Sequence, residues 1–92
     1  MIKSWANRAT EKFAEAGKGK FSGLDEDAAL DMLVSLNAAT SLADLSPLKS
    51  IGLHKLKGDR RNQWAMTING RWRLCFRFES GDAWDVEIVD YH

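Results

Sequence analysis

The sequence has little of what marks secreted, membrane-spanning or disordered chains. Among its 92 residues there is one cysteine and one proline, and 13 basic side chains balance 13 acidic ones. A lone Cys75 cannot form an internal disulfide, which favours a reducing compartment such as the cytoplasm. No apolar run approaches the ~18 residues of a membrane span, and no signal-peptide pattern opens the chain. We therefore expect a cytoplasmic protein without a membrane segment, folded as a single domain over residues 1–92.

The zero net charge conceals a strong segregation along the chain. Residues 1–23 carry a net charge of +3, residues 24–48 carry −5, residues 49–77 carry +7 and residues 78–92 carry −5. A polyanion such as RNA binds to local positive charge, so a basic block can bind it even when the net charge of the protein is zero. The alternative is that the basic block pairs with the acidic ones inside the fold.

Helical periodicity occupies the N-terminal half. It predicts a first helix over residues 7–16, with Gly17 as its C-cap, and a second helix from about Asp25, where three acids suit the positive end of the helix dipole. Met1–Trp5 is predicted as a short strand, and residues 38–50 as a connection with one helical turn at Leu42–Leu45. The apolar positions of the second helix predict a buried stripe made of Ala29, Leu30, Leu33, Val34 and Leu36.

From residue 52 the apolar period changes to two, which indicates strands. Alternating segments run around Trp64–Ile68, Trp72–Phe78 and Trp84–Ile88, with turns at Asn69-Gly70 and at residues 80–82. Because a one-residue slip turns every side chain to the other face, we expect loops that keep one face apolar. This register places Met66 opposite Trp72, Phe78 opposite Trp84, Arg77 opposite Asp85, and Asp90 near Trp72.

Together these elements predict an α+β fold, with two N-terminal helices packed on one face of a mostly antiparallel sheet. The helices cover a wall of Trp, Phe, Leu, Ile and Met side chains. In the middle of its strand Cys75 is expected to be a small packing residue rather than a nucleophile. It shares the other face with Arg71, Arg73 and Arg77, beside Asp85 and Glu87.

The chemistry-bearing residues gather where the sheet begins and ends. His54 opens the first strand, and the chain closes in Asp90-Tyr91-His92, within reach of Arg71 and Arg73. RNA cleavage suits this set, since the ribose 2′-OH must lose a proton, the leaving 5′-oxygen must gain one, and histidine can do either near neutral pH. Lys57 and Arg73 suit the charge that develops on the phosphate, and Tyr91 offers a ring for base stacking.

Each of these groups also has a structural interpretation. A terminal histidine can be merely solvated, and Tyr91 can cap the core with its ring. No ligand spacing supports a metal site, even one built from His54, Cys75, Asp90 and His92. We therefore expect neither a metal nor another cofactor.

Several separated motifs carry a family resemblance. They are the opening Met-Ile-Lys-Ser-Trp, the stretch from Leu53 to Arg60, Asn69-Gly70-Arg71-Trp72-Arg73, Gly81-Asp82-Ala83 and the terminal Asp-Tyr-His. These motifs resemble the HigB toxins of bacterial type II toxin–antitoxin systems, within the RelE/ParE toxin superfamily. The resemblance spans essentially the whole chain.

The resemblance implies a RelE-like fold and a metal-independent endoribonuclease that cleaves mRNA in the A site of the 70S ribosome and halts translation. A cognate HigA-type antitoxin would neutralise it. The resemblance maps the family's active-site groups onto His54, Lys57, Arg73, Asp90, Tyr91 and His92. The resemblance implies that Tyr91 is the base-stacking member and that His54, Asp90 and His92 handle or orient protons.

Two other functions stay open. A ParE-like toxin would bind DNA gyrase without cutting RNA, and a plain interaction module would dock a partner on the polar sheet face. The histidines and the Asp-Tyr-His terminus favour the nuclease, since a gyrase binder needs no titrating pair. The acidic block 24–48 lies on the helical side, where an antitoxin can bind away from the basic face.

Overall fold

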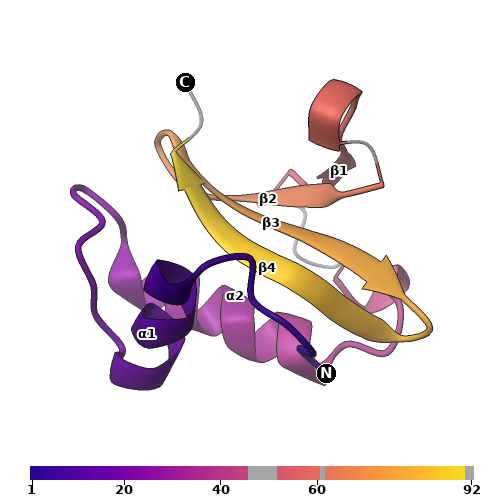
Figure 1. The fold of residues 1–92 in the computed structure, drawn as a ribbon, viewed down its shortest axis with the longest axis horizontal. Helices are drawn as coiled ribbons and strands as arrows, with labels where there is room; N and C mark the ends of the chain where they lie inside the picture. Colours follow the sequence, from indigo (N-terminus) through magenta and orange to yellow (C-terminus); the bar gives the residue numbers. More distant parts are fainter. Residues whose placement is uncertain (46–51, 61, 91–92) are drawn as a thin grey trace.

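The computed structural model describes residues 1–45, 52–60 and 62–90. Helices α1 (Arg8–Ala16) and α2 (Glu26–Ala38) precede the strands β1 (His54–Lys55), β2 (Trp64–Asn69), β3 (Trp72–Glu79) and β4 (Asp82–Asp90). The strands form one antiparallel sheet in the order β1-β2-β3-β4, and both helices lie on the same side of it (Figure 1). This arrangement confirms the predicted α+β class. None of the helices in the described ranges is long and apolar enough to cross a membrane.

Side-chain caps explain where the helices begin. Asn7 accepts a hydrogen bond from the backbone N–H of Thr10 at 2.9 Å, and Asp25 accepts one from Ala28 at 3.1 Å. Each cap satisfies a donor that the first helical turn leaves without a partner. Helix α1 ends at Gly17, whose φ of 77° is a left-handed conformation that glycine adopts without strain. Both helices and the short 3-10 turn η1 (Leu42–Asp44) therefore confirm the sequence prediction.

The buried stripe of α2 differs from the prediction at Leu30, which is only partly buried, at Met32, which is buried although it was not predicted, and at Val34. The side chains that face the sheet are Ala29, Met32, Leu33 and Leu36. Val34 was expected among them, but it is 69% exposed. Successive residues on a helix point about 100° apart, so the stripe through Leu33 and Leu36 leaves Val34 on the flank.

The N-terminal segment adds a parallel edge to the sheet. Ile2 bridges Ala83 and Trp5 bridges Val86, both in parallel orientation. The backbone N–H of Lys3 donates to the carbonyl of Ala83 at 2.7 Å, and the N–H of Val86 donates to Ser4 at 3.1 Å. The predicted strand over Met1–Trp5 is therefore reduced to two isolated bridges. The segment still covers part of the β4 edge, which would otherwise invite pairing with another chain.

The register of the β2–β3 hairpin keeps the predicted apolar face but not the predicted partners. Met66 pairs with Leu74 rather than with Trp72, and the register shifts between Thr67 and Asn69. The bulge therefore lies inside the strand rather than in the loop. Met66, Leu74 and Phe76 all face the helices, because a shift of two residues preserves the face.

The β3–β4 hairpin carries a second bulge, which corrects the placement of Trp84. Arg77 pairs with Trp84 and Phe78 with Ala83, instead of Arg77 with Asp85 and Phe78 with Trp84. The register shifts between Cys75 and Arg77, and Asp85 adopts a φ of 53°. This extra residue turns Trp84 to the face of Arg77, so that Ala83 joins Val86 and Ile88 in the core.

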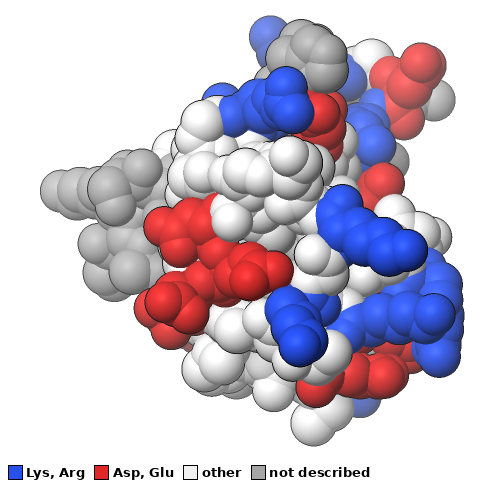
Figure 2. Space-filling view, turned by 90° about the vertical axis from the view of Figure 1, so that its left-hand side faces the viewer, with Lys and Arg blue, Asp and Glu red and all other residues white. Residues whose placement is uncertain are grey.

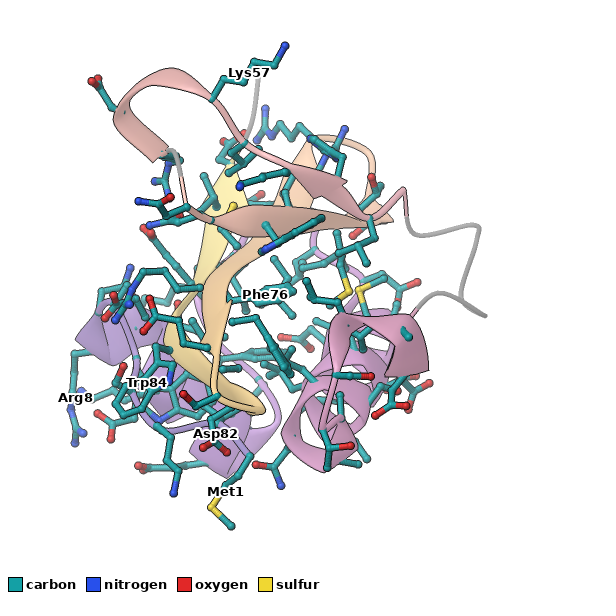
Figure 3. All side chains as sticks on the ribbon, turned by 90° about the vertical axis from the view of Figure 1, so that its right-hand side faces the viewer. Met1, Arg8, Lys57, Phe76, Asp82 and Trp84 are labelled. Carbon is teal, nitrogen blue, oxygen red and sulfur yellow. The ribbon has the colours of Figure 1, made fainter. Side chains whose placement is uncertain are left out.

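Two clusters of buried side chains lie on the two faces of the sheet. The larger one, between sheet and helices, contains Phe13, Leu36, Met66 and Phe76, and Figure 3 shows Phe76 at its centre. The smaller one lies on the other face and contains Leu56, Ala65 and Cys75, with Val89 packed against it. Cys75 is fully buried, as expected of a packing residue.

The charges remain segregated in space as they are in sequence. On the end of the molecule shown in Figure 2, a compact group of acidic side chains is separate from most of the basic ones. Part of the basic block does pair with acids of β4: Arg60 with Glu87 at 3.2 Å, Arg71 with Asp90 at 3.2 Å and Arg77 with Asp85 at 2.8 Å. The hydrogen bond from Arg77 to Asp85 raises the pKa of that guanidinium. The pairing alternative thus holds for these three arginines.

The contact between Thr10 and β4 predicts a specific loss of stability. Thr10 is fully buried and its hydroxyl accepts a hydrogen bond from the N–H of Ile88 at 3.1 Å. Thr10→Val keeps the shape but leaves that buried donor without a partner, so the free energy of unfolding should fall by about 1–3 kcal/mol. Urea denaturation measures it. Thr67→Val on β2 is the matched control, and an equal loss in both variants would contradict the role of this hydrogen bond.

Candidate active site

His54 lies on β1 with its side chain exposed and one ring nitrogen engaged. β1 pairs with β2, and His54 lies opposite Ala65. Its Nδ1 is 2.8 Å from the carbonyl oxygen of Gly52. A carbonyl oxygen can only accept, so this hydrogen bond requires the proton on Nδ1 and leaves Nε2 as the atom able to take up or deliver a proton. Gly52 adopts a φ of 60°, which favours glycine two residues before the histidine.

The segment that carries His54, residues 52–60 with 62–63, folds back over the sheet and is called the arm below. Leu56 anchors the arm to the sheet. Its side chain is only 5% exposed and packs against Ala65 and Cys75. Its backbone N–H also donates to the carbonyl of Gln63 at 2.9 Å. The guanidinium of Arg60 donates to Gln63 and to Glu87, both at 3.2 Å. The arm is therefore tied to β4 across the width of the sheet.

Lys57 projects from the arm into solvent (Figure 3). It is exposed and follows the buried Leu56 directly. It has no ion pair with any residue in the described ranges. Its ammonium group is therefore available to a phosphate.

Arg71 and Asp90 meet at the edge of the sheet where β3 begins and β4 ends. The Nε of Arg71 lies 3.2 Å from Oδ1 of Asp90, and its guanidinium lies 5.9 Å from the ring centre of Trp72. Asp90 pairs with Trp72 in the ladder, which confirms the expected register at this end. Because both side chains are partly exposed, this pair orients the two groups more than it stabilises the fold.

Arg73 is held by the backbone of the adjoining turn. Its guanidinium donates to the carbonyls of Gly70 at 2.6 Å and Trp72 at 3.1 Å. These bonds use one terminal nitrogen, Nη1. A planar guanidinium with its donors in a fixed fork is the group that matches phosphate geometry.

The ladder shows which predicted residues share a face. Ala65 pairs with His54 on one side and with Cys75 on the other, so the side chains of His54 and Cys75 project to the same face. Arg73, two residues before Cys75 on β3, projects there as well. With neighbouring strands ~4.8 Å apart, β1 and β3 are separated by roughly 10 Å, a span that a bound phosphodiester can bridge.

Asp90 is not part of that set. Asp90 pairs with Trp72, which faces the helices, so Asp90 lies at the rim with Arg71 rather than beside His54. Tyr91 and His92, predicted to stack on a base and to handle a proton, lie outside the described residues. Their roles stay predictions.

Cys75 is excluded as a nucleophile by its surroundings. Burial raises the pKa of its thiol, an effect that Glu87 adds to and that Arg60 and Arg73 oppose. A neutral, enclosed thiol is a poor nucleophile. Within residues 1–45, 52–60 and 62–90, no three His, Cys, Asp or Glu side chains come together as metal ligands.

Comparison with known proteins identifies the family. A family model described as the RelE-like toxin of the type II toxin–antitoxin system HigB matches residues 3–92. The chain belongs to this family of toxins. It is also 37% identical to a protein named Endoribonuclease HigB from Proteus vulgaris, over an alignment of 95 residues that covers all of both chains. Membership of a toxin–antitoxin family implies that this toxin has a cognate antitoxin.

Sequence reasoning missed the groups that hold the arm in place. Arg60 and Glu87 are 27 residues apart, and no local pattern links them. The carbonyl of Gly52 was also missed, although a glycine two residues before a candidate catalytic histidine is a visible signal. These contacts orient His54 and Lys57 without being reactive themselves.

The buried environment of Cys75 predicts a protected thiol. In the folded toxin Cys75 should react with a thiol reagent such as Ellman's reagent at least about tenfold more slowly than in guanidinium. A Cys75→Ala variant that also carries Ala9→Cys, at an exposed position of α1, is the matched control and should react at once. Equally fast reaction of native Cys75 would show that the arm does not cover it.

Proposed function

We propose that this toxin is a metal-independent endoribonuclease that cleaves mRNA in the A site of the ribosome, and so inhibits translation in the cytoplasm. The observation that carries the proposal is its full-length likeness to a protein named Endoribonuclease HigB. The exposed His54 and Lys57 of the arm and the half-buried Arg73 of β3 support the same chemistry. The cognate antitoxin would be of the HigA type.

The reaction needs two proton transfers and no metal. A base removes the proton of a ribose 2′-OH, whose oxygen attacks the adjacent phosphorus, and an acid protonates the departing 5′-oxygen. The products are a 2′,3′-cyclic phosphate and a 5′-hydroxyl end. His54 suits either transfer through Nε2, because Gly52 holds the proton on Nδ1.

The cations of the site suit the charge that develops on the phosphate. Lys57 is exposed, and Arg73 is fixed by two backbone carbonyls before any substrate arrives. Donors that are already oriented need no reorganisation during the reaction, which is the main source of electrostatic stabilisation in enzymes. Tyr91, stacking on an unpaired base, and His92, as the second proton carrier, complete the proposed site.

Exposure of the site supports a dependence on the ribosome. His54, Lys57 and Arg71 are exposed, so the toxin alone would leave a flexible single strand largely solvated and poorly oriented. Orientation of the attacking and leaving groups supplies a large part of the catalytic effect. An mRNA already held in the A site provides that orientation from outside the toxin.

Mapping of 5′ ends on a translated mRNA tests the function. With ribosomes present, the toxin should create new ends at A-site codons, and chelation of divalent ions after assembly should not stop cleavage on complexes that remain intact. Without ribosomes, few new ends should appear. If no ends appear in either condition and DNA gyrase is inhibited instead, the toxin acts as a ParE-like poison and the proposal is wrong.

Substitution of His54 tests the site. His54→Ala should lower the cleavage rate on ribosomes by about 10²–10⁴-fold, the usual effect of removing a general acid or base. Lys55→Ala is the matched control, since Lys55 is the exposed neighbour on β1 whose partner in the ladder is Trp64. Circular dichroism shows whether both variants fold. A folded His54→Ala toxin with undiminished cleavage would remove His54 from the site.

A further inference from the structure

A groove between the helices lies apart from the candidate active site. It has a volume of about 390 Å³ and is lined mostly by apolar side chains, including Ile2, Trp5, Ala14, Leu30, Leu33 and Val34. Its lining comes from the N-terminal segment and from α1 and α2, which lie on one side of the sheet, whereas the arm packs through Leu56 on the other face (Figure 1). None of the residues placed in the candidate active site lines it.

The groove is where the described surface is unusually apolar. Among the described residues, the exposed large hydrophobic side chains are Val34, at 69%, and Met1, at 57%. Val34 lines the groove, and Met1 precedes Ile2, which lines it too. Exposed apolar groups that gather beside a hollow mark an interaction site more often than single scattered ones do.

Two acidic residues of α2 lie on the helix face that borders the groove. Asp27 and Asp31 are exposed, and they precede Val34 by seven and three residues, which places all three on one face of the helix. Neither carboxylate has an ion pair with a residue in the described ranges. Residues 24–45 contain acids but no lysine or arginine, so the whole border of α2 is negative.

We propose that this groove is the docking site of the cognate antitoxin, which inserts apolar side chains beside Val34 and places lysine or arginine residues against Asp27 and Asp31. The proposal rests on membership of a toxin–antitoxin family and not on RNA cleavage. An apolar anchor in a pocket with a charged rim is the common anatomy of a specific interface.

Other occupants fit the groove less well. RNA carries negative charge along its length and would be repelled by Asp27 and Asp31. A second copy of this toxin, docked with two-fold symmetry, would place the same acidic border against itself. A partner with basic residues around an apolar segment is not repelled by these acids. Charge complementarity also speeds its association.

Val34→Arg tests the proposal directly. The antitoxin encoded with the toxin, immobilised for biolayer interferometry, should bind this variant at least about tenfold more weakly, because the arginine fills the groove with a charge. Ala9→Arg is the matched control, with the same charge on an exposed position of α1 outside the groove, and should change affinity by no more than about twofold.

Reversal of the border charge tests the second half of the proposal. Asp31→Lys should weaken antitoxin binding mainly through a slower association rate, and the salt dependence of that rate should decrease. In cells, the Val34→Arg toxin should arrest growth even when the antitoxin is co-expressed.

Three results would overturn the proposal. The first is unchanged antitoxin affinity of a folded Val34→Arg toxin. The second is an equal loss for Ala9→Arg, which would reflect charge alone. The third is a change in the oligomeric state of the free toxin on Val34→Arg, with antitoxin affinity intact, which would assign the groove to a second copy. Since binding is measured without RNA, a failure of the proposed nuclease function would be seen separately in the 5′-end assay.

Discussion

Burial of the centre of β3 on both faces is the constraint on which the rest of the structure depends. Leu74, Cys75 and Phe76 are consecutive, and all three are fully buried. Alternate residues of a strand point to opposite faces, so this strand needs a cover on each side. The helices cover Leu74 and Phe76, while the arm covers Cys75 with Leu56. Cys75 thus contributes by being small enough to accept the arm, which carries the candidate catalytic residues.

The alternation of apolar residues predicted which face of each hairpin is buried, but not the bulges. A two-residue period fixes the face and leaves shifts of two residues undetermined, which is how Met66 came to pair with Leu74. The bulge at Asp85 was invisible because the residue with positive φ is an aspartate rather than a glycine. Its conformation depends on tertiary contacts: its N–H donates to the hydroxyl of Ser4 at 2.8 Å, and its carboxylate accepts from Arg77. The contact with Ser4 joins residues 81 positions apart, so no local pattern predicts it.

Part of the candidate site could likewise be predicted from local sequence patterns, and part depends on contacts between residues far apart in the chain. The strand containing His54 and the contact of Arg71 with Asp90 followed from periodicity and from the register at one end of the sheet. The support of the arm did not follow, because Arg60–Glu87 joins elements that the sequence separates. That ion pair also continues to α1: the second oxygen of Glu87 accepts a hydrogen bond from Asn7, the N-cap, at 3.3 Å. A single carboxylate therefore links the start of α1, the edge strand and the arm.

The zero net charge of the chain results from basic and acidic residues that lie largely on different sides of the sheet. The Cα extents are 30 × 26 × 26 Å, whereas exposed charges are screened over a Debye length of about 8 Å at physiological salt. A partner at the arm consequently responds to Lys57 and Arg73 and hardly at all to Asp27 and Asp31 behind the sheet. Net neutrality is thus no argument against binding RNA, since the acids of α2 lie on the other side of the sheet and the acids of β4 pair with Arg60, Arg71 and Arg77 rather than with Lys57. The same sheet that separates the two sets of side chains lets one small chain present a basic surface to one partner and an acidic, apolar groove to another.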